Sequence, residues 1–395
     1  MTANAFHNIS QIESSLWEAA DQLRANSKLT SSEYCMPVLG VIFLVKGDFI
    51  KRRAGFVMSS QASSAGHGEK EVRRKLVQTG DVDVMVAIRS NFFYTRTVPC
   101  ELWHFDRAKP AERKDKVLML DARAIYRKVT RKIYDFSPEQ QANLAAIVWL
   151  YRGQRDRFLG LVRGYIGRVC EESAAVDGVL SRFEILVADA HAPLAAFGKA
   201  VLGIDAVLAA PKQALNDPLI ELTDARHAYM TDRAALVNGR VGFNGKFSAA
   251  LPESNDAQHQ ARQVFDPLAD AARGLIKQVD LLYKLAARAA QLAQEMATNP
   301  AAAEFLDRRA VNKLVKQLDE ERKAAVEPLK AVTYLHRQVA WLQDRFPKAE
   351  MQDVLGLCKV VTRAEIEAAD WSLTPGRFVG VAPAEVDEDL EDLGV

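Results

Sequence analysis

The chain has 395 residues, of which 49% are apolar, enough for two or three packed domains. A formal net charge of +1 excludes a strong overall field that would draw the protein to nucleic acid or a membrane. No apolar run reaches the ~20 residues that cross a bilayer, and residues 1–10 lack a signal-peptide pattern. The four cysteines (Cys35, Cys100, Cys170 and Cys358) have no paired or zinc-binding spacing, so we expect reduced thiols in a cytoplasmic protein without a metal site.

Residues 1–50 are expected to form a helical segment of two helices. Ser10 and Glu13 have the spacing of a capping box, and Thr30 and Glu33 repeat it. Apolar residues recur at helical period after the first pair and form an almost unbroken run after the second. The second helix should therefore be buried on most of its sides.

Residues 51–135 differ in character and predict part of an α/β sheet. Apolar strands are expected at 54–60, 82–88 and 116–122, an alternating strand at 100–106, and an amphipathic helix at 68–80. Gly80 should end that helix. In the alternating strand, Glu101, Trp103 and Phe105 share one face, and His104 lies on the other. We expect His104 to be packed or hydrogen-bonded rather than a metal ligand.

Charge is concentrated in two segments. Residues 107–132 are strongly basic, and the last residues, "EVDEDLEDLGV", are acidic. One interpretation is a solvated face and a disordered end; the other is a surface that meets phosphate groups in a complex. The salt dependence of binding separates the two interpretations.

The loop "SNFFYTRTVP", residues 90–99, directly follows a predicted buried strand. Phe92, Phe93 and Tyr94 cannot all point inward from an extended loop. At least one ring should be exposed near the strand end, where open α/β sheets place their ligands, and could stack on a base removed from a duplex. The alternative is that the rings fill a small core.

Residues 136–395 predict a helical domain with an acidic tail. Ser137 and Pro138 have N-cap and N1 character, and a further helix is expected to begin at Asp266. From Leu268 to Met296 apolar residues alternate in steps of three and four, and a second long helix follows. We interpret the two as an antiparallel hairpin, either within an intramolecular bundle or as a partner-binding coiled coil.

Motifs for common chemistries are absent from the sequence. It contains no P-loop, no G-x-S-x-G turn and no metal-binding histidine spacing. Four other segments resemble the modification (methyltransferase) subunit of type I restriction-modification systems, a family of N6-adenine DNA methyltransferases. They are "LWEAADQLRANSKLTSSEYCMPVLGVIFL", residues 53–107, "KVLMLDARAIYRKV" and "DWSLTPGRFVGVAP".

The resemblance implies a DNA methyltransferase that uses S-adenosylmethionine. Family members assemble as two modification subunits with one specificity subunit, and with restriction subunits in the larger complex on double-stranded DNA. The C-terminal helices are implied to hold the specificity subunit. Asn91, Phe92, Phe93 and Tyr94 are implied to lie on the target-base side of the catalytic domain.

The chain departs from this family in one block. The glycine-rich cofactor turn and the N-P-P-F or N-P-P-Y motif are absent, and only Val45–Arg53 stands where the family has a long catalytic segment. No catalytic or cofactor-binding residue can therefore be assigned. We expect an internally truncated subunit that binds no S-adenosylmethionine and cannot methylate alone. The alternatives are a non-enzymatic scaffold or regulator that binds the specificity subunit, and an enzyme completed by another chain.

The expected fold is mostly helical, α+β/α. It comprises a helical segment at 1–50, a partial Rossmann-like methyltransferase sheet of about 3–5 strands at 51–135, and the helical domain at 136–395 with its long hairpin or coiled coil. Without the missing block, the strand at 54–60 should be an unprotected edge, or be covered by the N-terminal helices or another chain.

Overall fold

The computed structural model describes residues 53–64, 66–93, 97–204 and 207–381. The chain divides into two compact units. The sheet unit comprises the described residues up to Gln154 together with those from Glu350 onward, and the helical unit is Arg155–Ala349. The helical segment predicted at 1–50 and the acidic tail lie outside the described residues.

The sheet unit contains a mixed five-stranded sheet in the order β1-β3-β2-β4-β7. Its strands are β1 (Arg53–Ser59), β3 (Cys100–Asp106), β2 (Val82–Ile88), β4 (Lys116–Asp121) and β7 (Cys358–Thr362). β3 is antiparallel to both β1 and β2, so β1 and β2 run parallel with β3 inserted between them. β2 and β4 are parallel, and β7 is antiparallel to β4. The strand number agrees with the sequence prediction.

Several helices and short turns complete the sheet unit. They are η1 (Ser60–Ser63), α3 (His67–Gln78), η2 (Ala111–Arg113), α4 (Pro138–Tyr151), α10 (Arg363–Ala368) and η3 (Pro375–Arg377). Strands β5 (Arg127–Lys128) and β6 (Tyr134–Asp135) form a separate hairpin. Gly80 has a φ of 73°, in the left-handed region, directly after α3, so the predicted helix end is confirmed. Ser137 caps α4 in a capping box with Gln140.

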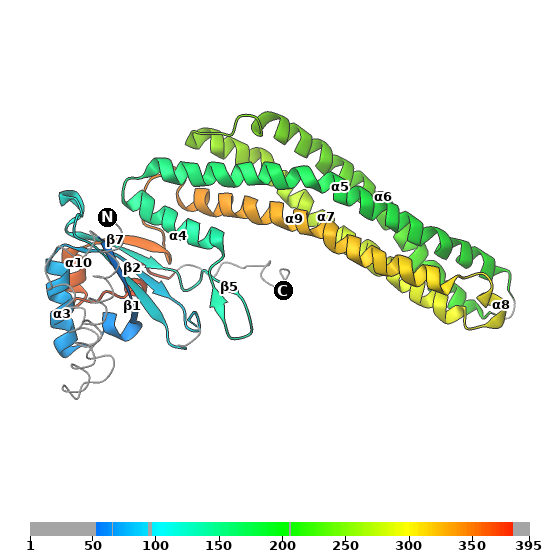
Figure 1. The fold of residues 1–395 in the computed structure, drawn as a ribbon, viewed down its shortest axis with the longest axis horizontal. Helices are drawn as coiled ribbons and strands as arrows, with labels where there is room; N and C mark the ends of the chain where they lie inside the picture. The colour runs from blue at the N-terminus through cyan, green and yellow to red at the C-terminus, as the bar shows by residue number, and fades with distance from the viewer. Residues whose placement is uncertain (1–52, 65, 94–96, 205–206, 382–395) are drawn as a thin grey trace, which may run out of the picture. The chain divides into compact units, whose positions relative to one another are not determined.

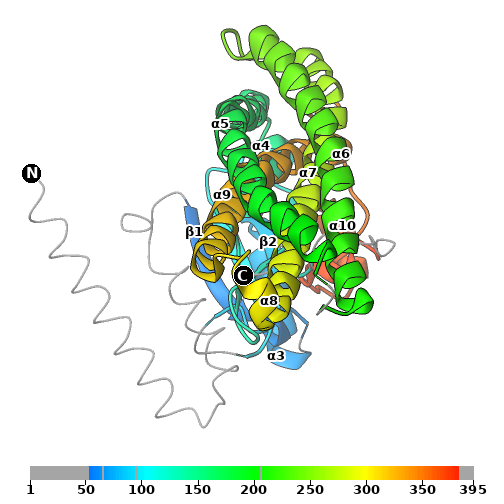
Figure 2. The ribbon, with the colours of Figure 1, turned by 90° about the vertical axis from the view of Figure 1, so that its right-hand side faces the viewer.

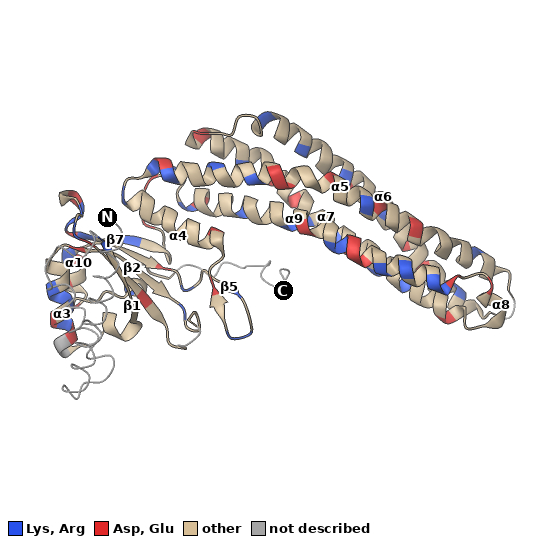
Figure 3. Ribbon diagram, in the orientation of Figure 1, with Lys and Arg blue, Asp and Glu red and all other residues tan. Residues whose placement is uncertain are grey.

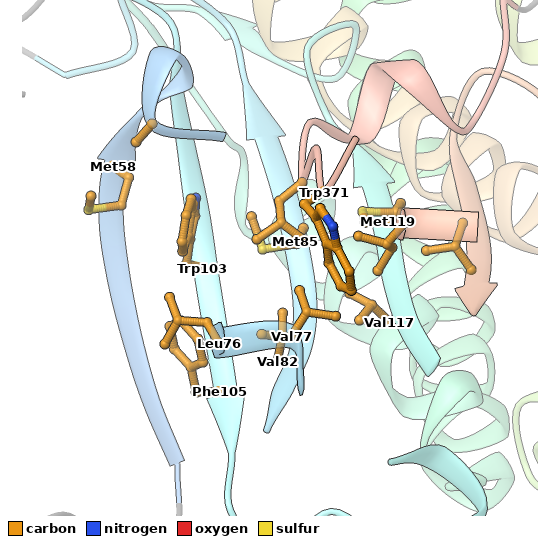
Figure 4. Close-up of a cluster of buried hydrophobic side chains, with 14 of the residues drawn as sticks. Met58, Leu76, Val77, Val82, Met85, Trp103, Phe105, Val117, Met119 and Trp371 are labelled. Atoms are coloured by element: carbon orange, nitrogen blue, oxygen red, sulfur yellow. The ribbon is translucent and has the colours of Figure 1, made fainter. Parts of the chain in front are cut away.

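An apolar cluster occupies one face of the sheet (Figure 4). Trp103 and Phe105 of β3 and Met85 of β2 contribute to it, as the predicted alternation requires. Trp371 and Leu373, from the far end of the chain, belong to the same cluster. The C-terminal segment is therefore part of the core of the sheet unit.

The helical unit is built from four long helices and one short one. They are α5 (Arg155–Leu202), α6 (Ala209–Phe247), α7 (Asn255–Met296), α8 (Pro300–Ala303) and α9 (Arg308–Arg345). The main contacts join α5 to α9, α6 to α7 and α7 to α9, so the long helices lie side by side (Figure 1, Figure 2). The predicted apolar positions of α7, among them Leu275, Val279 and Leu282, are buried within this unit.

Two sequence expectations are corrected by these elements, the extent of the helical domain and the start of α7. The predicted helical domain at 136–395 contains β7, which joins the sheet by pairing with β4, and the structure places α4 in the sheet unit. Of the two interpretations of the predicted hairpin, the intramolecular bundle is confirmed, and a coiled coil is not. The helix expected to begin at Asp266 begins at Asn255, with Ser254 as N-cap and Pro267 inside it. Proline removes only one backbone hydrogen bond, and packing along the whole helix outweighs that loss.

By length and composition alone, α5 could cross a membrane. A core helix of a bundle meets the same criterion, and α5 packs against α6, α7 and α9. The sequence of α5 has no uninterrupted apolar run of that length. Charged residues such as Glu171 and Asp177 interrupt it.

Candidate functional site

The loop after β2 lies at the carboxyl end of the two parallel strands β2 and β4. Asn91 has a φ of 60°, a left-handed conformation that asparagine tolerates better than most residues. Its carbonyl oxygen accepts a hydrogen bond from the Tyr134 amide at 3.2 Å. The loop is therefore joined by its backbone to the β5–β6 hairpin.

Phe92 and Phe93 are both half-buried. Their ring centroids are 5.8 Å apart in an edge-to-face arrangement, and the Phe92 centroid lies 4.4 Å from that of Phe136. Neither ring belongs to the apolar cluster of Figure 4. Tyr94 lies outside the described residues. The structure thus brings Asn91, Phe92 and Phe93 together in one loop, and their place on a target-base side stays a prediction.

Arg89, two residues before Asn91, holds two tyrosines together. Its guanidinium carbon lies 3.7 Å from the ring centroid of Tyr126 and 3.6 Å from that of Tyr134. The two rings are nearly perpendicular, at 82°, with centroids 5.1 Å apart, so the cation occupies the corner between them. Such cation–π contacts contribute roughly 0.5–2 kcal/mol each, more where water is excluded. The buried Nε of Arg89 meets no acceptor among the described residues.

Two carboxylates lie on one face of the sheet, level with the carboxyl ends of β2 and β4. Glu101 of β3, Ala87 of β2 and Asp121 of β4 are register partners, so their side chains point to one face. Glu101 is 1% exposed, and the Ser63 hydroxyl donates a hydrogen bond to it. Burial raises the pKa of Glu101 to about 7, against the opposing effects of the Ser63 hydrogen bond and the charge of Arg123.

Asp121 is paired with Arg123, whose Nη2 lies 2.5 Å from the carboxylate. This pairing sits against η3, because a Cβ atom on Gly376 would overlap the Arg123 Nη2. A side chain at position 376 would displace the guanidinium. The glycine of the "TPGR" sequence therefore has a packing role at this edge.

Arg73 fixes the C-terminal segment to the loop after β1. It is 1% exposed, and its Nε and Nη1 donate to the carbonyl oxygens of Trp371 and Ala62, each at 2.9 Å. Asp370 and Trp371 both have a φ of 59°, a left-handed conformation that is strained for such residues. The buried charge of Arg73 thus stabilises a turn that the local sequence does not favour.

A second polar cluster lies at the opposite end of β2 and joins α4 to the sheet. Asp83 of β2 is fully buried and forms ion pairs with Arg113 at 3.2 Å and Arg152 at 2.6 Å. Lys109 donates from its Nζ to the carbonyl oxygens of Val82 and Lys116, and burial lowers the pKa of Lys109 to about 8. These groups satisfy one another, so the cluster is structural.

The sequence prediction missed most of these groups. Glu101 carried one usable signal, since a carboxylate on the apolar face of an alternating strand indicates a buried acid with a partner. No sequence pattern marks Arg89, Tyr126 and Tyr134 as neighbours, because only the fold places them together. Among the described residues, no group of three His, Cys, Asp or Glu side chains could hold a metal ion.

Residues 41–161 match the model of the N-6 DNA Methylase family. The resemblance seen in the sequence is confirmed. A type I restriction enzyme methylase subunit of Methanocaldococcus jannaschii, MjaIX, is 36% identical over 80 residues, which cover 20% of this chain and 14% of that protein. The HindI methylase subunit of Haemophilus influenzae is 33% identical over 88 residues, covering 22% of this chain and 18% of that protein.

The chain spans less than a fifth of the length of these curated relatives. A crystal structure of a type I restriction-modification methyltransferase subunit from Streptococcus thermophilus is also similar, at 14% identity. It covers 30% of this chain and 24% of that one with a TM-score of 0.26, which does not establish a shared fold.

Proposed function

We propose that this chain is an internally shortened modification subunit of a type I restriction-modification system, which assembles with its partners but does not methylate DNA alone. One observation carries the proposal: a segment of the N-6 DNA Methylase family occurs in a chain without the glycine-rich turn and the N-P-P-F or N-P-P-Y motif. The five-stranded sheet is then the remaining part of a Rossmann-like catalytic domain.

The arrangement at the edge of β1 supports this interpretation. Within the described residues, β1 has β3 as its one strand neighbour, and its side chains alternate between exposed and half-buried over its first five positions. Val57 is 55% exposed. A strand from the interior of a sheet would be covered on both sides, so β1 fits a strand whose usual neighbour is missing.

Methyl transfer to adenine in this family is implied to need an Asn side chain and a Pro carbonyl that accept hydrogen bonds from the amino group. The polar groups at the described sheet edge are already engaged: Glu101 accepts from Ser63, and Asp121 from Arg123. A group held by an internal partner is a poor acceptor for a substrate. These residues therefore offer no replacement for the missing motif.

Isothermal titration calorimetry of the full chain with S-adenosylmethionine tests the loss of the cofactor half. We expect no saturable heat. A relative that carries both motifs, measured in the same buffer, is the positive control. Stoichiometric binding by this chain would contradict the proposal.

The helical unit is the part proposed to hold the specificity subunit. Ile220, Met230 and Val241 are exposed on α6, and their spacing of ten and eleven residues puts them on one side of the helix. A protein partner that lies along this side of α6 would contact all three side chains. These three residues are therefore the first positions to change in an assembly experiment.

Co-expression with the specificity subunit, followed by size-exclusion chromatography, tests assembly. The full chain should co-elute with the partner, and changing Ile220, Met230 and Val241 together to Asp should reduce co-elution. Exposed Lys313 and Lys316 of α9, changed to Asp, form the control. If the unaltered chain does not co-elute, the assembly role is excluded, and so is a regulator that competes for this subunit.

A second candidate is an enzyme completed by another polypeptide, which is favoured by the edge of β1 that pairs with no strand among the described residues. A strand of a partner chain could add to this edge through backbone hydrogen bonds. Transfer of labelled methyl groups to double-stranded DNA by a mixture of this chain with another modification subunit is the test. Activity in the mixture that exceeds the activity of the other subunit alone would support completion, and its absence would exclude it.

A further inference from the structure

The β5–β6 hairpin carries a basic tip. Its two strands pair Arg127 with Asp135 in register, and the Arg127 guanidinium meets the Asp135 carboxylate at 2.7 and 2.9 Å. Between the strands, the amides of Val129 and Thr130 both donate to the Ile133 carbonyl. The turn is therefore closed by backbone hydrogen bonds and by one ion pair.

Three cations of this hairpin have no carboxylate partner. Lys128, Arg131 and Lys132 are all exposed, and within the described residues no carboxylate forms an ion pair with any of them. Figure 3 colours the basic and acidic residues along the ribbon, in which the hairpin is labelled at β5. The one acid of the hairpin, Asp135, is already engaged by Arg127. The tip thus presents uncompensated positive charge over a few residues, although the chain as a whole is almost neutral.

The hairpin is fixed by four kinds of contact, three of them to the end of β2 and the loop after it, and one to α4. The Arg89 guanidinium lies against the rings of Tyr126 and Tyr134 at its base. The Tyr134 amide donates to Asn91, and the Phe136 ring packs on Phe92. Farther along, Gln140 of α4 donates its side-chain amide to the Tyr126 carbonyl at 3.0 Å.

This fixation separates the hairpin from an ordinary solvated turn. A turn that only provides solubility needs no cation held between two tyrosines and no backbone bond to a neighbouring loop. A pre-ordered basic tip loses less conformational entropy when it binds an anion, so its charges act at a defined place. That place lies beside the Asn91–Phe93 loop, because the Asn91 carbonyl and the Phe92 ring both contact the residues of the hairpin base.

We infer that the β5–β6 hairpin binds the phosphate backbone of double-stranded DNA through Lys128, Arg131 and Lys132. This inference rests on the proposed function, which makes duplex DNA the polyanion that this chain meets. Three cations on a rigid turn can each replace counterions on neighbouring phosphates, which gives affinity without sequence preference. The hairpin would thereby hold the duplex next to the Asn91–Phe93 loop.

Fluorescence anisotropy of a labelled duplex oligonucleotide of mixed sequence, titrated with the full chain at several salt concentrations, tests the inference. In the tip variant, Lys128, Arg131 and Lys132 are changed together to Ala. We expect binding to weaken at least tenfold at low salt. The slope of log K against log salt should fall by about 0.9 for each lost phosphate contact, roughly two to three in total.

Two matched proteins control for charge and folding. The variant with Arg309, Lys313 and Lys316 of α9 changed to Ala removes the same exposed charge from the helical unit and should bind as the unaltered chain does. The variant with Lys128→Arg, Arg131→Lys and Lys132→Arg keeps the tip charge and should keep the salt slope. Unchanged circular dichroism of the tip variant shows that it remains folded.

The inference is overturned if the tip variant binds with the same affinity and slope, if both charge-removal variants lose the same affinity, or if the unaltered chain binds no duplex. Preference for single-stranded RNA over the duplex would overturn it as well. Co-elution with the specificity subunit is measured on the same tip variant. Retained co-elution shows that a failure of DNA binding concerns the hairpin and leaves the proposed assembly role intact.

Discussion

The two units of this protein differ in what they bury. All buried charged side chains among the described residues lie in the sheet unit: Arg73, Asp83, Glu101, Asp106, Lys109 and Asp121. The buried polar side chains of the helical unit are hydroxyls, amides and one histidine, His336. Long helices satisfy their own backbone groups and need only an apolar stripe to pack.

The sheet unit contains buried backbone groups that no helix satisfies. Its core joins segments from opposite ends of the sequence, such as Trp103 and Trp371, and their loops and turns leave carbonyl oxygens without helical partners. Arg73 and Lys109 bind such oxygens from inside the fold. The difference indicates that the sheet unit depends on specific polar contacts, and the helical unit on general apolar packing.

The largest effect is expected from Asp83→Ala. This change leaves Arg113 and Arg152 uncompensated, and breaking a buried ion pair costs roughly 3–5 kcal/mol. Urea unfolding should show the lower stability, and amide hydrogen exchange should be faster in β2 and β4. The helical unit should be unaffected.

Asp280→Ala is the matched control in the helical unit. Asp280 pairs with Arg322 at a partly exposed position of the bundle, and such pairs contribute about 0–1 kcal/mol. If the two changes destabilise their units equally, the sheet unit does not depend on buried charge in the way proposed here.

Leu282→Ala is the corresponding change in the helical unit. Leu282 of α7 is 1% exposed, and removing its side chain should destabilise the bundle by roughly 3 kcal/mol through the lost burial and the cavity left behind. Leu281, its neighbour on the same helix, is 45% exposed and is the control. Thermal unfolding should distinguish the two variants, and a similar loss for Leu281→Ala would show that the exposed face of α7 also packs.

The contrast between the units also explains what the sequence could predict. Local patterns identified α3 with its stop at Gly80, the four strands between residues 53 and 121, and the buried positions of α7, because each depends on residues close in the chain. β7 was not predicted. It is five residues long, and its partner β4 lies more than two hundred residues earlier, so no local pattern marks the pairing.

The candidate site follows the same rule. The loop after β2 was located because a run of aromatics directly follows an apolar strand. The partners of that loop were not, since Tyr126, Tyr134 and Phe136 reach it only through the hairpin. The pairing of Glu101 with Ser63 likewise depends on the sheet register, which the sequence alone does not determine.

Glu101→Gln tests how the buried carboxyl of the sheet unit makes its stability depend on pH. The pKa of Glu101 is raised from 4.5 to about 7 in the folded protein, so the folded state holds a proton that the unfolded state has released. Stability from this group is therefore complete below pH 4.5 and is lost as pH rises to about 7, by roughly 3 kcal/mol in total. The neutral amide carries no such loss.

We expect the Gln variant to be more stable than the unaltered protein above pH 7 and equally stable below pH 4.5, as measured by urea unfolding at each pH. Glu112→Gln, at an exposed position of the sheet unit and measured at the same pH values, is the control for the change from a carboxyl to an amide. A Gln variant that is less stable at every pH would show that the charged carboxylate is needed at position 101.

The smallest effect is expected from Arg89→Met, and it tests how the sheet unit uses a cation beyond ion pairing. Methionine keeps the length of the side chain and removes the charge that faces the two tyrosine rings, at a cost of about 1–2 kcal/mol. Because the rings hold the hairpin base, the Val129 amide should exchange its hydrogen about 5–30-fold faster. Arg89→Lys keeps a cation and should give an intermediate rate. If the exchange at Val129 is unchanged in both variants, the hydrogen bond from the Tyr134 amide to Asn91 and the Phe92–Phe136 contact are enough to fix the hairpin, and the Arg89 cation serves only the fold of the loop.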